Sequence, residues 1–199
     1  MVLVELKMAN EIDLFNLEDP KSVARKIITL ERPIDLRLIL ERRVKIPEEY
    51  EKRELSFDDG NGLKIFDLIR DDLVKFSKAG YPENLQTPVF EAILNAYQHG
   101  NQRDPNKKIT FAYDIGDIAL NILVEDEGGF IDPVFVPFIL RHRERDVRKK
   151  FINFYEFSGR EKPKENNGTG TSFMHAYMDE VNYYLGERGM IVHLIHNKI

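Results

Sequence analysis

Three polar side chains spaced four residues apart form the most informative pattern in this 199-residue sequence. Glu91, Asn95 and His99 lie in the segment EAILNAYQHG, which begins at residue 91. Residues four apart share one face of an α-helix, so this spacing predicts a polar stripe. A carboxylate, an amide and an imidazole can accept protons, donate hydrogen bonds or bind a cation. The stripe is therefore a candidate chemical site, although a solvated helix face would show the same residues.

The same segment carries apolar residues at positions that fit the other side of a helix. The i, i+3, i+4, i+7 spacing of a core-facing surface is followed by Phe90, Ile93, Leu94 and Tyr97. We expect this helix to follow Thr87-Pro88 and to end at a loop over 100–106. A helix that packs on one side and carries polar groups on the other is suited to hold a site.

Asp126 marks a second candidate position, at the end of an alternating segment over 118–125. Gly128 and Gly129 follow it, and glycine lets a backbone approach a ligand because it has no Cβ. The alternative interpretation is an ordinary turn aspartate.

A second glycine motif, Gly168-Thr169-Gly170, precedes a segment that we expect to be helical through about Val181. The free N–H groups and the positive dipole end at the start of a helix suit phosphate groups. Thr171 and Ser172 could add further donors. A plain loop with a helix N-cap is the alternative.

The elements around these motifs predict an α+β fold. A short strand over 54–58, a helix over 63–76, a hairpin of 108–114 with 118–125, and a final strand from Met190 surround the candidate residues. Helices followed by paired strands indicate two layers. Residues 1–52 are expected to contain a strand at 2–6 and a helix over 19–30, and we assign this extension no function.

Composition excludes several classes of function. The chain has no cysteine, so it has no disulfide, thiolate nucleophile or cysteine-bound metal. A net charge of -5 makes a nucleic-acid partner unlikely, because nucleic-acid-binding proteins usually present a net basic surface. No run approaches the roughly 18 to 20 apolar residues of a membrane span, and the N-terminus lacks a signal-peptide layout. We therefore expect a cytoplasmic protein without a membrane partner.

Taken in order, the three motifs resemble the N box, G1 box and G2 box of the GHKL ATPase superfamily, which includes gyrase and the histidine kinases. The matching stretches are EAILNA from Glu91, DEGGFIDP from Asp126, Gly168-Thr-Gly170 and MDEV from Met178. Within the superfamily the sequence is most similar to anti-sigma-factor serine/threonine-protein kinases of the SpoIIAB and RsbW type. The resemblance covers residues 53–199 and implies a two-layer Bergerat fold, with a mixed, mostly antiparallel sheet and helices on one face.

The resemblance also implies ligands and roles. ATP would bind with Mg2+, and Asn95 would supply the single protein ligand to the metal. Glu91 would be the catalytic base or would orient the nucleophile. Asp126 would accept a hydrogen bond from the exocyclic amine of adenine and reject guanine. ATP contacts would extend to His99, which is as readily an ordinary surface histidine, and to the glycine motifs at Gly128, Gly129 and Gly168 to Thr171.

The sequence departs from the family pattern in two places. Phe130 occupies the last glycine position of the G1 box, or else one residue is missing between Gly128 and Gly129. The segment over about 133–167 is longer and more charged than the lid of the anti-sigma kinases. It contains a run of net charge +4 over 141–150, and the cations expected to approach a γ-phosphate are Arg160, Lys162 and Lys164.

Residues 1–98 contain no histidine, which argues against a histidine autokinase with an upstream phosphoacceptor helix. The first hypothesis is a kinase that transfers the γ-phosphoryl group to a protein partner, either a sigma-like factor or its antagonist. The second is a nucleotide-switched or degenerate interaction module without transfer. An ATPase whose basic lid contacts nucleic acid ranks third. The resemblance to the anti-sigma kinases also implies a homodimer.

Overall fold

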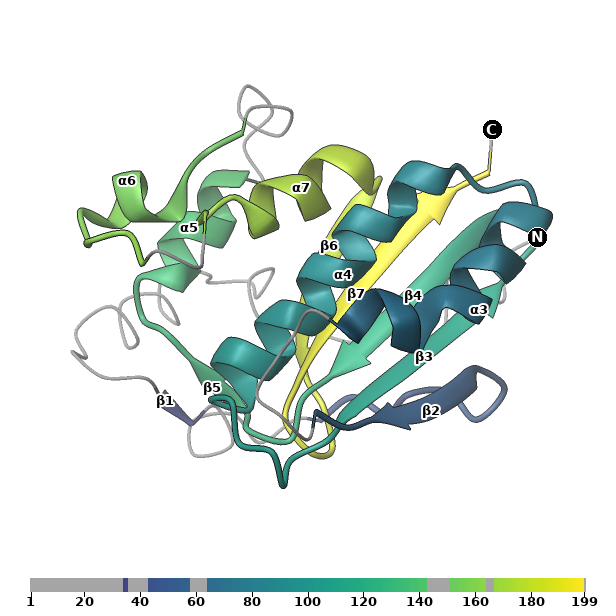
Figure 1. Cartoon of the computed structure of the whole chain (residues 1–199), viewed down its shortest axis with the longest axis horizontal. Helices are drawn as coiled ribbons and strands as arrows, with labels where there is room; N and C mark the ends of the chain where they lie inside the picture. The colour runs from purple at the N-terminus through teal and green to yellow at the C-terminus, as the bar shows by residue number, and fades with distance from the viewer. Residues whose placement is uncertain (1–33, 36–42, 58–63, 143–150, 164–166, 199) are drawn as a thin grey trace.

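The computed structural model describes residues 34–35, 43–57, 64–142, 151–163 and 167–198. Within these residues five strands form one sheet in the order β2-β3-β4-β7-β6, and each neighbouring pair is antiparallel. The strands are β2 (Glu51–Leu55), β3 (Ile109–Ile115), β4 (Ala119–Glu125), β6 (Glu180–Leu185) and β7 (Met190–Asn197). Helices α3 (Ile65–Lys78), α4 (Gln86–Asn95) and α7 (Gly170–Tyr177) cover one face of this sheet (Figure 1). The predicted two-layer α+β class is confirmed.

The main core lies between the sheet and these helices. Side chains alternate across a strand, so every second residue of β4 and β7 points toward the helices. Ile122, Val124 and Leu194 do so and are buried against the core that α4 supplies through Val89 and Ile93. Predicted core residues Phe90 and Leu94 are only partly buried, because they lie at the edge of this layer. The sheet therefore supports α4 along the buried side of the helix.

The rear face of the sheet carries a second, smaller apolar cluster. It consists of Val44, Tyr50, Ala112, Leu123, Tyr184 and Ile191, with Ile46 packed against it. The backbone N–H of Val44 donates to the carbonyl of Leu185 over 2.7 Å, beside a parallel bridge to Gly186. The segment before β2 therefore packs on the sheet, and the boundary expected between residues 52 and 53 falls inside β2.

One predicted helix is wrong at its end, and the strand predicted over 54–58 overlaps only the last two residues of β2. The helix that begins at Gly170 ends at Tyr177 instead of about Val181, because the following residues join the sheet as β6. The N–H of Asp179 already bonds the carbonyl of Ile195 over 2.9 Å. The next residues alternate and are rich in Val and Tyr, which is the strand pattern. The predicted helix near 63–76, the hairpin and the final strand are confirmed as α3, the β3–β4 pair and β7.

The segment expected to be a lid contains two short helices, α5 (Phe135–His142) and α6 (Phe154–Ser158). It follows β5 (Phe130–Ile131), which pairs with β1 (Ile34–Asp35) in a separate two-stranded sheet. A 3-10 turn, η3 (Glu83–Leu85), precedes α4. The strand and helix predicted before residue 34 lie outside the described residues, as do residues 143–150 of the basic run. In the described part of the chain no helix is long and apolar enough to cross a membrane.

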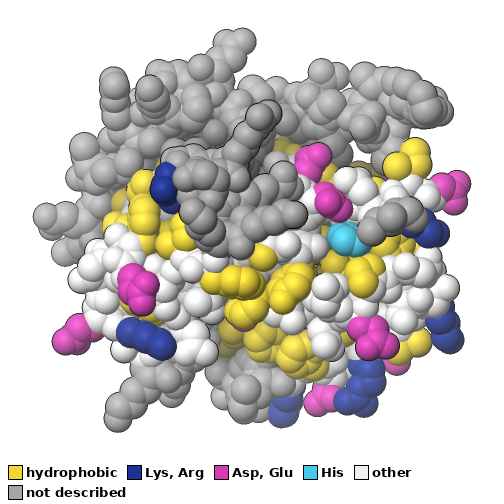
Figure 2. Space-filling view, turned by 90° about the horizontal axis from the view of Figure 1, so that it is seen from above, with side chains coloured by type: hydrophobic (Ala, Val, Ile, Leu, Met, Phe, Trp, Pro, Cys, Tyr) yellow, Lys and Arg dark blue, Asp and Glu magenta, His cyan; other side chains and the backbone are white. Residues whose placement is uncertain are grey.

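Three aromatic side chains form a row along α7, of which Phe151 is exposed and Phe173 and Tyr177 are partly buried. Phe151 is 55% exposed and its ring lies 5.0 Å from that of Phe173, which in turn stacks on Tyr177 with an interplanar angle of 3°. In the view from above, hydrophobic side chains gather in groups on this side of the molecule (Figure 2). Exposed apolar groups of this kind are common at protein interaction sites.

Candidate functional site

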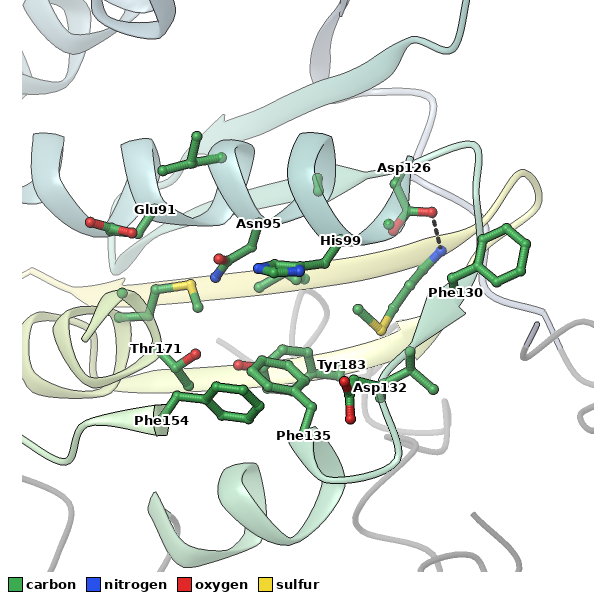
Figure 3. A pocket seen from close by; sticks show the side chains of 18 of the residues that line it. Glu91, Asn95, His99, Asp126, Phe130, Asp132, Phe135, Phe154, Thr171 and Tyr183 are labelled. Carbon is green, nitrogen blue, oxygen red and sulfur yellow. Dashed lines mark hydrogen bonds between the residues drawn. The ribbon is translucent and has the colours of Figure 1, made fainter. Parts of the chain in front are cut away.

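A cavity of about 300 Å³ lies between α4 and α7 and is closed on its far side by β5, α5 and α6. This volume is at the lower end of the range for small-molecule sites. Figure 3 shows the polar side chains of α4 on one wall and aromatic rings on the other. Charged or amide groups are contributed by Glu91, Asn95, His99, Asp126, Asp132 and Arg160.

The predicted polar stripe is present, and all three of its members line this cavity. The helix changes its winding within the stripe, because α4 ends at Asn95 and continues as the π-helical turn η4 (Ala96–Gly100). The N–H of Asn101 bonds the carbonyl of Ala96 over 2.7 Å, five residues back. π-turns occur often at functional sites. The spacing alone did not reveal this turn, which places His99 and Gly100 differently from a continuing α-helix.

Glu91 lies at the end of the stripe that faces the beginning of α7 (Figure 3). A Cβ atom added to Gly170 would come within 2.3 Å of Glu91 Oε2, so the glycine is required by this approach. Burial raises the pKa of Glu91, because a charged carboxylate loses hydration in the cavity. A carboxyl group with a raised pKa is a better proton acceptor when ionised.

Asn95 is half-buried and presents its amide to the cavity one turn after Glu91 (Figure 3). An amide oxygen is a hard ligand of the kind that Mg2+ accepts. Among the described residues no group of three or more His, Cys, Asp or Glu side chains could hold a metal ion. The side chains fit a Mg2+ that takes one protein ligand and draws the others from a bound nucleotide and water.

His99 lines the cavity and its side chain is exposed there. The surrounding protein atoms nevertheless reduce the hydration of the imidazolium form, which lowers the pKa of His99. The charge of Asp132 opposes this effect, and that of Arg103 adds to it. The imidazole is therefore mostly neutral at pH 7, and a neutral imidazole can donate one hydrogen bond to a ligand.

Asp126 lies at the opposite end from Glu91 and is almost completely buried, with 1% exposure. Its Oδ1 accepts hydrogen bonds from the N–H groups of Gly128 (2.9 Å), Gly129 (2.6 Å) and Met190 (3.3 Å). Burial raises its pKa to about 6, and these three bonds oppose the rise. Gly128 and Gly129 do not line the cavity. They hold the carboxylate, and a Cβ at Gly128 would collide with the carbonyl of Gly100.

The second glycine motif meets the cavity in part. Gly168, Gly170 and Thr171 line it, whereas Thr169 does not. Ser172 does not line the cavity either. Its hydroxyl donates to the carbonyl of Ile152 over 2.7 Å and lies 2.8 Å from His142 Nε2. It fixes α7 to α5 and to the segment before α6.

Sequence reasoning missed the apolar wall opposite the stripe. Its rings come from elements that are far apart in the chain, namely β5, α5, α6 and β6, and the labelled ones are Phe130, Phe135, Phe154 and Tyr183 (Figure 3). Their order in the sequence gave no periodic signal, since each element contributes one or two residues. The rings of Phe135 and Tyr183 are nearly perpendicular, with an interplanar angle of 88°, and an aromatic lining of this kind suits an aromatic base or another planar group.

Arg160 lines the cavity, but its guanidinium is paired with Asp132. Both of its terminal nitrogens bond that carboxylate, and Nη2 lies 3.1 Å from Oδ1. The segment after α6 is thereby attached to the turn before α5. Lys162 is exposed, and Lys164 lies outside the described residues.

The geometry joins an acidic group, an amide, a helix N-terminus and a buried aspartate around one cavity, and the sequence comparison agrees with it. The sequence profile described as histidine kinase-like ATPase domain matches residues 74–196. The chain belongs to this family. No curated protein matches the chain.

Membership in the histidine kinase-like ATPase domain family makes ATP the ligand of the domain, typically together with Mg2+. The match begins within α3 and includes every strand from β3 to β7. All of the cavity-lining residues fall inside it. The predicted GHKL superfamily is thus confirmed, and the fold is the one that this family uses to bind ATP.

Proposed function

We propose that this protein is an ATP- and Mg2+-dependent serine/threonine-protein kinase that resembles the anti-sigma-factor kinases and phosphorylates a protein partner. The proposal rests chiefly on one observation: Glu91 and Asn95 line the same cavity one helical turn apart, with the Glu91 carboxylate against the first residue of α7. A base, a metal ligand and a phosphate-binding helix end are the groups that phosphoryl transfer requires.

The adenine base would bind at the Asp126 end of the cavity. An ionised carboxylate has about four acceptor positions, and only Oδ1 is used by the three N–H donors. Capacity remains to accept from the exocyclic amine of adenine, whereas the O6 acceptor of guanine would be repelled. The apolar wall that includes Phe135 and Tyr183 supplies contact area for the base and the ribose.

The phosphates would lie toward Glu91 and the start of α7, where Gly168, Gly170 and Thr171 line the cavity. The first N–H groups of a helix have no intrahelical partner and favour anions. Bound Mg2+, with Asn95 as its protein ligand, would neutralise charge on the phosphate oxygens. Thr169, which lies outside the cavity, would act by shaping the turn.

In the transfer step Glu91 accepts the proton of the partner's hydroxyl group. The hydroxyl oxygen forms a bond to the γ-phosphorus, while the bond from that phosphorus to the β–γ bridging oxygen breaks. The bridging oxygen keeps the electron pair and leaves as part of ADP. Atoms and charge balance without a further reactant.

The aromatic row of Phe151, Phe173 and Tyr177, in which Phe151 is exposed and the other two rings are partly buried, supports a protein partner, because apolar side chains on a surface favour association. A sigma-like factor or its antagonist is the partner class that the anti-sigma kinases use, and a homodimer is the assembly implied by them. Affinity capture with the full chain, followed by mass spectrometry, would identify the partner. Loss of capture on Phe151→Ser would support this surface.

A second candidate is a nucleotide-switched interaction module without transfer. It is favoured by the altered G1 turn, in which Phe130 occupies the last glycine position or one residue is missing between Gly128 and Gly129. The Lys107 ammonium group lies over the Phe130 ring, 5.5 Å from the ring centroid. Such a protein would bind ATP and change its partner affinity but leave the γ-phosphate in place.

Two measurements separate these functions. Calorimetric titration with Mg-ATP should give binding that Asp126→Asn removes, and failure of the unmodified chain to bind would overturn both candidates. Transfer of labelled γ-phosphate to a captured partner or to water should be lost in Glu91→Ala and kept in the matched control Glu83→Ala, an exposed carboxylate in η3. Binding without any transfer would establish the switch.

A further inference from the structure

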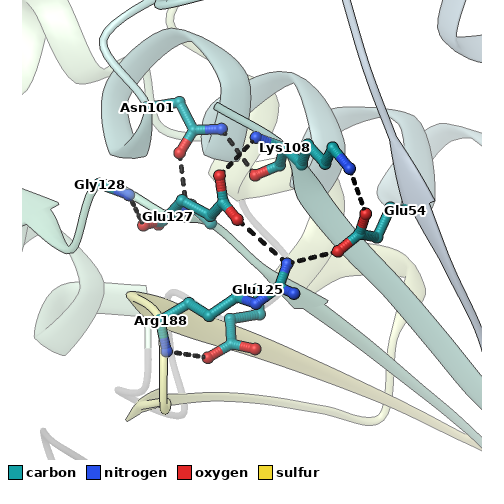
Figure 4. A network of polar contacts seen from close by, with 8 residues as sticks. Glu54, Asn101, Lys108, Glu125, Glu127, Gly128 and Arg188 are labelled. Atoms are coloured by element: carbon teal, nitrogen blue, oxygen red, sulfur yellow. Dashed lines mark hydrogen bonds and ion pairs between the residues drawn. The ribbon is translucent and has the colours of Figure 1, made fainter. Parts of the chain in front are cut away.

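The loop that carries Asp126 is held by a polar network on the side away from the cavity (Figure 4). The side chain of Asn101 is fully buried and accepts from the N–H of Glu127 over 2.7 Å, while its own amide donates to the carbonyl of Lys108 over 2.9 Å. The N–H of Lys108 donates to the Glu127 carboxylate over 2.8 Å. The residue after Asp126 is thus fixed by two other elements.

Arg188, in the turn between β6 and β7, contacts both acidic neighbours of Asp126 (Figure 4). Its backbone N–H donates to Glu125 Oε1 over 2.8 Å, and its Nη1 lies 3.1 Å from Glu127 Oε1. The same Nη1 lies 2.8 Å from Glu54 Oε1 in β2. One arginine therefore joins the turn, the Asp126 loop and the edge strand of the sheet.

The turn that contains Arg188 is pressed directly onto Asp126. The N–H of Asp126 bonds the carbonyl of Met190 over 3.1 Å, and a Cβ at Gly189 would come within 2.2 Å of Asp126 Oδ1. A displacement of this turn would therefore move the carboxylate or remove one of its hydrogen-bond donors.

Asp126 also stands between two carboxylates, so its ionisation depends on nearby positive charge. Burial and, to a smaller extent, the charge of Glu125 raise the pKa of Asp126 to about 6 against the three backbone hydrogen bonds. Burial raises the pKa of Glu125, and the backbone N–H and the charge of Arg188 oppose that rise. The titratable and charged groups on the elements around Asp126 and its cavity include Glu54, Glu91, His99, Arg103, Lys107, Lys108, Glu125, Glu127, Asp132, Arg160, Glu187 and Arg188.

We propose that Arg188 is a positioning residue for nucleotide recognition: its side chain holds the Asp126 loop through Glu127, and its positive charge beside Glu125 and Glu127 keeps the Asp126 carboxylate ionised. The inference rests on the proposed function, in which Asp126 accepts from the adenine amine. Arg188 touches no bound nucleotide in this role. Its side chain is 43% exposed, so its effect on affinity is moderate and its effect on pH dependence is the more specific one.

The test is the Mg-ATP affinity between pH 5.5 and 8.5, measured by calorimetry. The unmodified chain should lose affinity as the pH falls through about 6, since a protonated Asp126 cannot accept from the amine. Arg188→Met should bind about threefold to fivefold more weakly at pH 8. The midpoint of its pH profile should lie roughly half a unit higher, because two carboxylates lose their counter-charge.

Three further variants make the test specific. Arg188→Lys keeps the charge and should keep the midpoint. Glu125→Gln removes the carboxylate whose charge raises the pKa of Asp126 and should lower the midpoint. Arg43→Met is the matched control, because Arg43 contacts the same turn through the carbonyl of Glu187 over 3.2 Å but touches neither Glu125 nor Glu127. Titration of the nucleotide phosphates is common to every variant and cancels in the comparison.

An unchanged midpoint in Arg188→Met, or in Arg188→Gln should Arg188→Met fail to fold, overturns the inference. Thermal melting of each variant without nucleotide identifies a folding defect. If Asp126→Asn binds Mg-ATP as tightly as the unmodified chain, the assignment of Asp126 itself fails. If Asp126→Asn abolishes binding and Arg188→Met follows the unmodified profile, only the role of Arg188 is refuted.

Discussion

The backbone of Gly170 lies against the carboxylate of Glu91, so closely that a side chain at residue 170 would occupy the place of Oε2. This contact joins α4 to α7, two helices that pack together over the sheet, and it sets where the carboxylate can sit within the cavity (Figure 1). The glycine is required here for close approach and not for an unusual backbone conformation.

Gly170→Ala should therefore reduce phosphoryl transfer more than ATP binding. A Cβ atom 2.3 Å from Oε2 forces the flexible carboxylate to move, while the helix itself accepts alanine readily. A misplaced base loses a large part of the roughly 100- to 10,000-fold contribution of general base catalysis. Single-turnover transfer and calorimetric Kd should be compared with those of Ala176→Gly in the same helix. A parallel loss of both quantities in Gly170→Ala would contradict this assignment.

Transfer by the proposed kinase should rise with pH through the raised pKa of Glu91. Burial favours the protonated form, and only the ionised form can accept a proton, so activity is lost as the pH falls through that pKa. Single-turnover rates at saturating Mg-ATP should show this rise from pH 4.5 to 8. In Glu91→Gln the residual rate should be independent of pH. A rise that persists in Glu91→Gln and disappears in His99→Gln would assign the base to His99.

Arg160 should contribute little to ATP affinity, because its guanidinium is already paired with Asp132. A partly exposed ion pair contributes about 0.2–1 kcal/mol, so Arg160→Met should weaken binding by less than roughly fivefold. Limited proteolysis between residues 151 and 163 should become faster as this attachment is lost. Lys162→Met, an exposed cation in the same segment, is the control. A much larger loss of affinity would mean that Arg160 leaves Asp132 to contact the phosphates.

The sequence predicted the parts of the site that depend on local spacing. Glu91, Asn95 and His99 lie within nine residues, so helical periodicity alone placed them on one wall of the cavity. Alternation likewise predicted the hairpin that delivers Asp126 to the end of β4.

What the sequence did not predict depends on contacts between distant segments. The pairing of Arg160 with Asp132 spans 28 residues, and the contact of Arg188 with Glu54 joins the turn before β7 to the opposite edge strand. The first two residues of β6, Glu180 and Val181, were also assigned to the end of a helix, because only pairing with β7 makes this short segment a strand. Local propensity gives way to such tertiary contacts.

His193 should make the protein less stable in mild acid. Its ring is buried at the rear of the sheet, where Nε2 lies 3.1 Å from Asn121 Oδ1, and burial lowers its pKa to about 4. Below an unfolded-state pKa of about 6.5 the unfolded chain binds a proton that the folded chain refuses until about pH 4. The free energy of unfolding should therefore fall across this window by roughly 3 kcal/mol from this group.

Urea unfolding at pH 7 and at pH 4.5 measures this contribution when the chain is compared with His193→Gln. Glutamine at residue 193 cannot titrate, so the free energy of unfolding of this variant should fall less between the two pH values. This holds even if its free energy of unfolding is lower at both. Asp126 and Glu91 have raised pKa values and act in the opposite direction, but they are common to both proteins and cancel. Equal pH dependence in the two proteins would show that His193 accepts its proton without loss of the fold.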